Sequence, residues 1–231
     1  PMRRAALSFV FVATAGVLAG CPDRSISELT PEQGRVEGKV LPVKINRDLD
    51  LLFLIDDSNS MADKQVNLAD NFPRFIDVLE TIPGGLPNIH IAVVTSDYGT
   101  KGAEDTMPGP AVRSGVGSCK GLGQDARMHM PSGITRNDKF LSDIHDPAFP
   151  SDPTKRVRNY DIDQLPLEAA FARMAKVGAA GCGFEQHLEA IKQALLPTKL
   201  ENAGFLRDNA FLGIIVIADE DDCSMKHSSL L

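Results

Sequence analysis

Three continuous apolar runs along the chain have the length and composition of buried strands. They span residues 51–55, 89–94 and 211–218. Runs in which polar residues do not alternate with apolar ones are typical of strands that are covered on both faces, as in a parallel sheet. The sequence therefore predicts a parallel sheet that is buried on both faces.

Segments with apolar residues at helical spacing lie between these runs and predict three helices. Their apolar stripes are Val66, Ala69, Phe72, Phe75, Ile76 and Leu79; Leu167, Ala170, Phe171, Met174 and Val177; and Phe184, Leu188, Ile191 and Leu195. We expect Pro73 to kink or restart the first helix, because proline has no amide hydrogen to donate. Strands alternating with helices predict an α/β fold: a doubly wound, mostly parallel sheet with helices on both faces.

Residues 97–163 do not follow this alternation. The segment is rich in Gly, Pro, Asp and Ser, and Met107-Pro108-Gly109-Pro110 and Phe149-Pro150 interrupt it. Loops of this length inside a compact domain are usually functional or disordered. We interpret the segment as an insertion that starts at the carboxyl end of a strand. Two roles remain open for it: recognition of a partner, or a flexible surface loop without a specific function.

Oxygen-bearing side chains follow two of the predicted strands immediately. Asp56, Ser58 and Ser60 come after the first apolar run, and Asp219 comes after the last. In doubly wound sheets, ligands bind beyond the carboxyl ends of the strands, which is where these residues are expected. Two carboxylates with two hydroxyls suit Mg²⁺, which takes few carboxylates and keeps several waters, and Mn²⁺ or Ca²⁺ are alternatives.

This order of residues resembles the von Willebrand factor type A family, whose metal-ion-dependent adhesion site has the pattern Asp-x-Ser-x-Ser at the end of the first strand. The resemblance covers roughly residues 48–231. It implies a von Willebrand factor A-like domain and four metal ligands: Asp56, Ser58, Ser60 and Asp219. It also implies that the metal binds an acidic group of a partner protein.

The sequence departs from the family at one ligand, a threonine on a second loop. Gly181-Cys182-Gly183-Phe184-Glu185 occupies that position here and offers no hydroxyl, so Glu185 or a water would have to replace it. An alternative role for Glu185 and Gln186 is capping of the following helix, because acidic residues in a first turn interact favourably with the helix dipole. The acidic residues 220–222 could likewise be metal ligands, and the alternative for them is a solvated acidic loop.

The amino terminus resembles a bacterial lipoprotein signal peptide. A basic start is followed by an apolar run at residues 5–17, which is short for a membrane span, and then by Leu18-Ala19-Gly20-Cys21. We expect a signal peptide at 1–20, lipidation of Cys21, and a tether at 21–47 that could end in an edge strand at 39–43. The lipid would anchor the domain in the bacterial cell envelope, at the outer membrane or the cell surface. A plain secretory signal or an N-terminal anchor helix is the alternative.

Composition fits one folded, exported, acidic domain. Hydrophobic residues make up 43% and charged residues 24% of the 231-residue chain, which is enough for one core. The formal net charge is −7, and loss of Arg3 and Arg4 with the signal peptide would make it −9. This charge argues against a nucleic-acid partner, because phosphate binding needs basic residues.

Three cysteines would remain beside the lipidated one: Cys119, Cys182 and Cys223. In an oxidising compartment a disulfide is expected. A bridge from Cys119 to either of the others would hold the insertion or the second loop beside the site, and the sequence leaves the pairing open.

The chain is also expected to be a truncated form. Pro1 precedes the initiator-like Met2, and only residues 223–231 follow the acidic cluster. By the resemblance, a complete domain of this family would have further strands and helices after that point.

These observations predict a binding module rather than an enzyme, because no general base or activated nucleophile is evident beside the four oxygen ligands. The alternative is a structural envelope lipoprotein with a degenerate, metal-free site. A third reading is a phosphohydrolase of the haloacid-dehalogenase type, which also binds Mg²⁺ at an aspartate after an apolar strand. That type needs a second aspartate two residues on, where this chain has Ser58.

Overall fold

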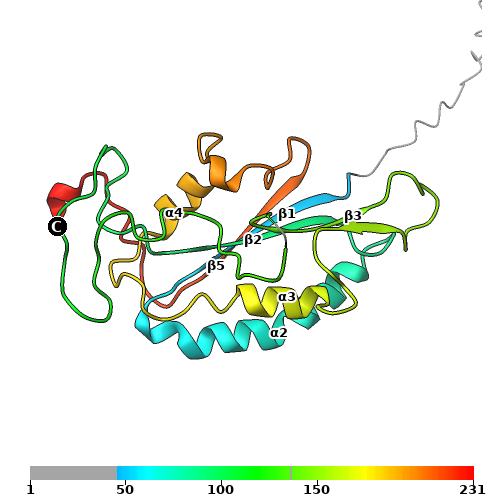
Figure 1. The fold of residues 1–231 in the computed structure, drawn as a ribbon, viewed down its shortest axis with the longest axis horizontal. Coiled ribbons are helices and arrows are strands. Elements are labelled where there is room, and N and C mark those ends of the chain that lie inside the picture. Colours follow the sequence, from blue (N-terminus) through cyan, green and yellow to red (C-terminus); the bar gives the residue numbers. More distant parts are fainter. Residues whose placement is uncertain (1–45, 136) are drawn as a thin grey trace, which may run out of the picture. The chain divides into compact units, whose positions relative to one another are not determined.

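A mixed sheet of five strands forms the centre of the protein in a computed structural model, which describes residues 46–231 except 136 (Figure 1). Cys21, the signal peptide and the edge strand expected at 39–43 lie outside the described residues. The strands are β1 (Asp48–Ile55), β2 (Asn88–Thr95), β3 (Leu141–His145), β4 (Arg156–Arg158) and β5 (Phe211–Ile217). The helices are α2 (Ala62–Glu80), α3 (Leu167–Met174) and α4 (His187–Ala194), with short 3₁₀ turns at Asn59–Met61, Leu200–Asn202 and Ser228–Leu230.

The spatial order of the strands is β4-β3-β2-β1-β5. The three strands predicted from the apolar runs are parallel: β1 pairs with β2 on one side and with β5 on the other. β3 and β4 are antiparallel to their neighbours and make the sheet mixed. Both strands come from residues 97–163, the segment interpreted as an insertion. That segment therefore adds two strands to the sheet in addition to its loops.

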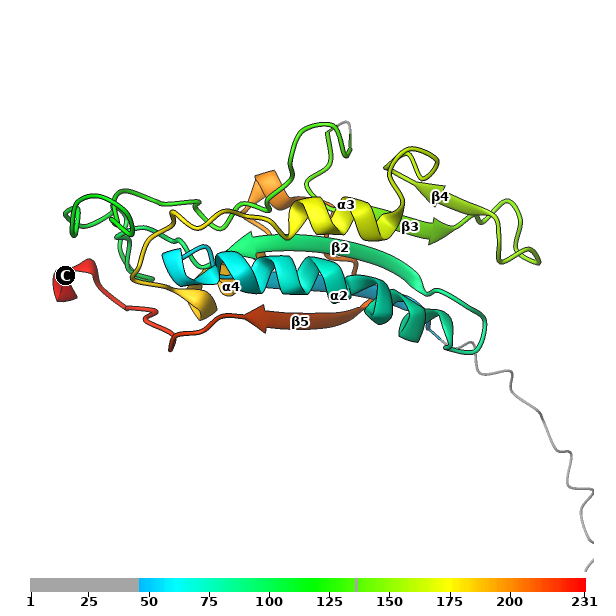
Figure 2. The same cartoon turned by 90° about the horizontal axis from the view of Figure 1, so that it is seen from below.

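Helices cover both faces of the sheet, as predicted: α4 lies on one side, and α2 and α3 lie on the other (Figure 1, Figure 2). On one face, Leu51, Phe53 and Ile55 of β1 pack against α2 and α3. On the other face, Leu52 and Leu54 pack against α4. All five side chains are at most 4% exposed, which explains why the β1 sequence is apolar without alternation.

Two details of the helix prediction change. Of the two effects expected of Pro73, a kink or a restart, the restart does not occur, because α2 runs from Ala62 to Glu80 with Pro73 inside it. The third predicted helix begins later than the apolar stripe, at His187 instead of near Phe184. The backbones of Glu185 and Gln186 just before it bond to Cys223 N and Ser96 O in other loops.

The outer edge of the sheet at β5 is unusual, because its large apolar side chains are exposed on both faces. Phe211 is 65% exposed, and Ile214 and Val216 are 44% and 47% exposed. Within the described residues β5 pairs only with β1. Most edge strands carry charges or prolines that prevent further pairing, and β5 carries neither.

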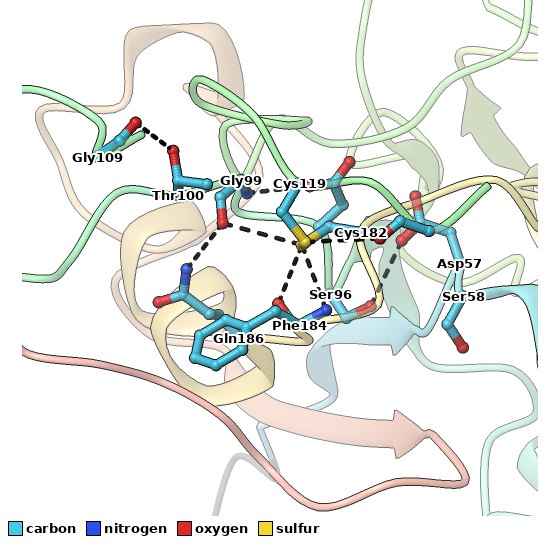
Figure 3. The surroundings of a disulfide bond; sticks show 12 residues. Asp57, Ser58, Ser96, Gly99, Thr100, Gly109, Cys119, Cys182, Phe184 and Gln186 are labelled. Atoms are coloured by element: carbon cyan, nitrogen blue, oxygen red, sulfur yellow. Dashed lines mark hydrogen bonds between the residues drawn. A yellow bond between two sulfur atoms is a disulfide. The ribbon is translucent and has the colours of Figure 1, made fainter. Parts of the chain in front are cut away.

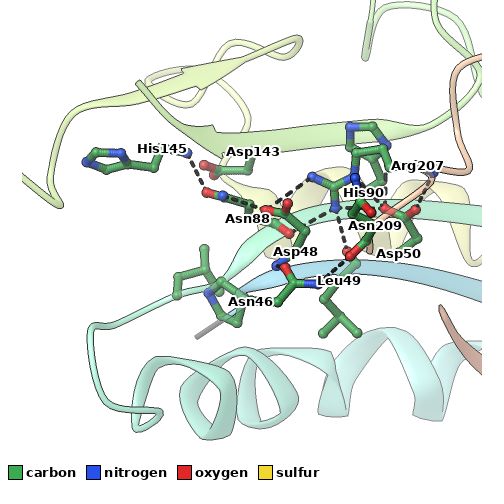
Figure 4. Close-up of polar contacts among 12 residues, drawn as sticks. Asn46, Asp48, Leu49, Asp50, Asn88, His90, Asp143, His145, Arg207 and Asn209 are labelled. Atoms are coloured by element: carbon green, nitrogen blue, oxygen red, sulfur yellow. Dashed lines mark hydrogen bonds and ion pairs between the residues drawn. The ribbon is translucent and has the colours of Figure 1, made fainter. Parts of the chain in front are cut away.

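A buried polar network fastens the amino-terminal ends of the parallel strands (Figure 4). Asp50 on β1 is fully buried and accepts hydrogen bonds from Arg207 N at 2.7 Å and from Arg207 Nε at 2.8 Å. Arg207 Nη2 also donates to Leu49 O and Asn88 O. His90 Nδ1 lies 2.7 Å from Phe205 O, and burial lowers the pKa of this histidine. One arginine thus joins the loop before β5 to β1 and β2.

We predict that Arg207→Met lowers the free energy of unfolding by about 3 kcal/mol, because it leaves the buried Asp50 carboxylate without its cation. Urea denaturation followed by circular dichroism measures the loss. Arg74→Met on the exposed side of α2 is the matched control and should change stability by less than about 0.5 kcal/mol. Equal effects of the two substitutions would contradict the role of the network.

Candidate metal centre

Backbone pairing brings the two predicted acidic positions to one edge of the sheet. Asp56 follows β1 directly, and its backbone N donates to Ile217 O at the end of β5 at 3.0 Å. Asp219 lies two residues beyond Ile217. Because β1 and β5 are parallel and in register up to Ile55 and Ile217, both carboxylates emerge from the same end of the sheet.

Hydrogen bonds connect all four predicted ligands to one another. Asp56 Oδ1 accepts from Ser58 N at 2.8 Å, and Asp56 Oδ2 accepts from Ser58 Oγ at 2.9 Å. Ser58 Oγ lies 3.4 Å from Ser60 Oγ. Ser60 Oγ donates to Asp219 Oδ1 at 3.1 Å. The structure therefore brings Asp56, Ser58, Ser60 and Asp219 together in one cluster.

The cluster has a buried end and an open end. Asp56 is fully buried and Ser58 is 4% exposed. Ser60 is exposed, and the Asp219 side chain retains 22% of its surface. Solvent or a partner can therefore reach the cluster from the side of Ser60 and Asp219, while Asp56 is held in a fixed orientation beneath them.

Lys64, which the sequence analysis did not consider, is bound at the open end. Its Nζ lies 3.1 Å from Asp219 Oδ2 and donates to Ser60 O at 2.9 Å. Burial raises the pKa of Asp219, but hydrogen bonds from Lys64 and Ser60 outweigh it and the net shift is downward. Asp219 thus has a cationic partner from its own chain. Position 64 is four residues, about one helical turn, after Ser60, so the helix pattern would have placed this lysine near the site.

Ser96 is a further contact of the cluster that the sequence analysis missed. It follows β2, is fully buried, and its Oγ donates to Asp56 Oδ1 at 2.7 Å and to Asp57 Oδ1 at 3.4 Å. The signal was present in the sequence, because Ser96 follows a predicted strand of the same parallel sheet. Ser96 ties the end of β2 to the end of β1.

Asp57 is buried and is covered by the second loop. Gly181 N donates to Asp57 O at 2.8 Å, and a Cβ on Gly181 would lie 2.3 Å from Asp57 Oδ1, so only glycine fits there. Burial, followed by the charges of Asp97 and Asp56, raises the pKa of Asp57 to about 7. The second loop therefore covers a buried acid, and its close approach requires the glycine at position 181.

A disulfide holds the second loop in place (Figure 3). Cys119 in the insertion is bonded to Cys182, and Gly183 N donates to Gly117 O at 3.1 Å. This pairing settles the choice that the sequence left open, and Cys223 is a free cysteine. The insertion is therefore fixed beside the site at this point.

The capping role considered for Glu185 and Gln186 is wrong. Gln186 is the N-cap residue of α4 but makes no side-chain capping hydrogen bond. Its amide Nε2 donates instead to Gly99 O and Lys101 O in the insertion. The first turn of α4 is capped from the segment after β5: Leu188 N donates to Asp222 Oδ1 and Glu189 N donates to Ser224 Oγ. Asp222, one of the acidic residues 220–222, thus caps the first turn of α4.

Glu185 is buried at the site with an unsatisfied oxygen. The residue is 1% exposed, and its Oε2 has no hydrogen-bond partner. Burial, followed by the charges of Asp56 and Glu220, raises the pKa of Glu185 to about 7. Its carboxyl group therefore lies within electrostatic reach of the Asp56 carboxylate.

Within residues 46–135 and 137–231, no three His, Cys, Asp or Glu side chains converge in the manner of a preformed metal site. The predicted ligand set contains only two such residues, because its other members are serines. None of the helices that the structure describes has the length and apolar character needed to cross a membrane. Comparison with protein-family models, curated proteins and solved structures found no match for the chain.

We predict that replacing both bridged cysteines, Cys119→Ser with Cys182→Ser, lowers the free energy of unfolding by about 2–4 kcal/mol. The bridge closes a loop with a sequence separation of 63 residues, so its loss increases the entropy of the unfolded chain. Urea denaturation measures the change. Cys223→Ser should leave stability unchanged, and a double variant as stable as the parent protein would contradict the prediction.

Proposed function

We propose that this protein is a metal-ion-dependent binding module. In this proposal Asp56, Ser58, Ser60 and Asp219 hold a divalent cation, Mg²⁺ or alternatively Mn²⁺ or Ca²⁺. The cation bridges to an acidic group of a partner protein. The observation that carries the proposal is the hydrogen-bonded cluster of these four residues, which is closed at Asp56 and open at Ser60 and Asp219.

The donor set fits such a cation. Carboxylate and hydroxyl oxygens are hard ligands, and Mg²⁺ is commonly held by one or two carboxylates while its remaining positions stay open to water or a ligand. When bound, the cation would supply Lewis acidity toward a carboxylate of the partner. Asp56, which is oriented by hydrogen bonds from Ser58 and Ser96, would bind the cation from the buried side of the site.

The fold and the location belong to the same proposal. Three central parallel strands with helices on both faces support a von Willebrand factor A-like domain. The lipobox-like sequence before Cys21 supports an anchor in the bacterial cell envelope, with the membrane reached through the lipid. Under this arrangement the domain meets its protein partner through the metal face, and no nucleic acid is involved.

We predict that Mg²⁺, Mn²⁺ or Ca²⁺ gives saturable heat in isothermal titration and stabilises the protein by about 2.7 kcal/mol at 100 times the dissociation constant. Asp56→Asn keeps the size of the side chain but removes the charge, and should abolish both effects. Asp63→Ala, at an exposed acid on α2, is the matched control and should bind as the parent protein does. Absence of saturable heat in the parent protein would contradict the proposed function.

A metal-free scaffold is the second candidate, and the ion pair between Lys64 and Asp219 favours it. An ammonium group at this place already neutralises one of the two predicted carboxylates. Exposed ion pairs of this kind contribute little to stability, so a divalent cation could displace Lys64 at small cost. The binding module and the metal-free scaffold therefore predict different effects of removing Lys64 on metal affinity.

We predict that Lys64→Met raises the metal affinity several-fold, because it removes a competing cation while keeping the aliphatic part of the side chain. Titration calorimetry measures the change. Lys192→Met, on α4 and paired with Glu189, removes the same charge away from the site and serves as control. If neither the parent protein nor Lys64→Met binds metal, the protein is a metal-free scaffold and the proposed metal-dependent binding is wrong.

A further inference from the structure

The outer edge of β5 presents apolar side chains that nothing among the described residues covers. Leu212, Ile214 and Val216 are 41%, 44% and 47% exposed on the face of the sheet that carries α4. Phe211 is 65% exposed on the other face. A long apolar edge strand with no charge or proline of its own is a site at which a further strand can pair.

The backbone of β5 is unpaired on the same side. Ile217 O points toward β1, because it accepts a hydrogen bond from Asp56 N. The backbone groups of successive residues in a strand point to opposite sides, so the N–H and C=O groups of Leu212, Ile214 and Val216 point outward. Three residues therefore offer both a donor and an acceptor to a neighbouring strand.

The chain shortly before the described residues has the sequence that such a neighbour needs. Residues 39–43 read Lys-Val-Leu-Pro-Val. In an extended strand, alternate residues face opposite sides, so this sequence would place apolar groups beside both exposed faces of β5. Lys39 and Pro42 are residue types with which natural edge strands prevent further pairing, and β5 has neither.

The first described residues already lie beside β5 (Figure 4). Asn46 donates through its side-chain Nδ2 to Asn209 O, two residues before β5 begins. Neighbouring strands are about 4.8 Å apart, so a strand on the outer side of β5 would lie about 10 Å from β1. Three extended residues span about 10 Å. Residues 44–46 are therefore long enough to connect position 43 at this edge with β1.

We infer that residues 39–43 bind the outer edge of β5 as a further strand, antiparallel to β5. The direction follows from the connection, because the chain must reach the amino-terminal end of β5 in order to enter β1, which is parallel to β5. Arg35 would then come close to the exposed acidic residues 220–221 at the carboxyl end of β5, which adds charge complementarity. This interaction does not depend on a bound metal.

The direction of this strand also decides where the preceding chain leaves the domain. Residues before 39 would start from the carboxyl end of the sheet, the end at which Asp219 lies. The segment expected to be a tether would therefore begin beside the candidate metal centre, at the opposite end of the sheet from Asn46.

A second copy of the protein fits the same edge less well. Antiparallel pairing of two β5 strands about a twofold axis at Ile214 would place Asp208 of one copy opposite Glu220 of the other, and like charges directly opposite each other are destabilising. Stable dimers bury about 800 Å² on each partner, which is more than the edge of one seven-residue strand offers. A segment of the same chain needs less contact area, because it is already held near the edge.

The test is amide hydrogen exchange, followed by NMR on the full chain. If residues 39–43 are bound, the amides of Leu212, Ile214 and Val216 should exchange at least about tenfold more slowly than in an unstructured peptide, which corresponds to an open state below about 10%. The double substitution Val40→Asp with Leu41→Asp removes apolar contacts on both faces. It should raise the exchange rates of these three amides at least about fivefold.

Ile26→Asp with Leu29→Asp is the matched control. It introduces the same two charges earlier in the chain, outside the segment inferred to pair, and should leave exchange at β5 as in the parent protein. The amides of Ile91 and Val93 in the buried strand β2 should stay protected in every variant, which shows that the domain remains folded.

Two results would overturn the inference. In the first, the three outward amides of β5 exchange in the parent protein as fast as in an unstructured peptide, so the edge is free. In the second, they are protected equally in the parent protein and in Val40→Asp with Leu41→Asp, so another group covers the edge. Protection that then increases with protein concentration would identify a second copy as that group.

Discussion

The carboxylate of Asp56 is the contact on which the arrangement of the site depends. It is fully buried at the end of β1, and its two oxygens accept hydrogen bonds from the turn that follows β1 and from Ser96 after β2. The Asp56 backbone is paired with the end of β5. One residue therefore joins the carboxyl ends of three parallel strands. The positions of Ser58, Ser60 and Asp219 relative to one another follow from this junction.

Charge is distributed unevenly around that junction. The acidic residues Asp57, Asp97 and Glu185 are all raised in pKa, with burial as the largest cause in each case. At the opposite end of β1, Asp50 is equally buried but is compensated by Arg207. One end of β1 thus carries an acid that is neutralised within the protein, and loops at its other end hold a group of buried acids that is not. Burial of unneutralised acids lowers stability, and such groups are typical of functional sites.

The sequence predicted the parallel part of the fold because β1, β2 and β5 are buried on both faces and are therefore apolar throughout. It did not predict β3 and β4, because these are short strands with polar residues, such as Asp143 and Arg156, that pair with each other. The four oxygen ligands were found from their position after apolar strands. Ser96 and Lys64 were missed although their positions were readable, Ser96 directly after a predicted strand and Lys64 four residues after Ser60; their partners Asp56 and Asp219 are distant in sequence. The capping of α4 by Asp222 and the choice of Cys182 as partner of Cys119 likewise arise only from tertiary contacts.

The bond between Cys119 and Cys182 encloses β3, β4 and α3 within one covalent ring. A protease that cuts the chain once inside this ring opens a loop but releases no fragment, since the two new ends stay joined through the sulfur atoms. The elements that form one edge and part of one face of the sheet therefore remain attached to β1 and β5 after such a cut. Only reduction together with cleavage can separate the second loop from the insertion that supports it.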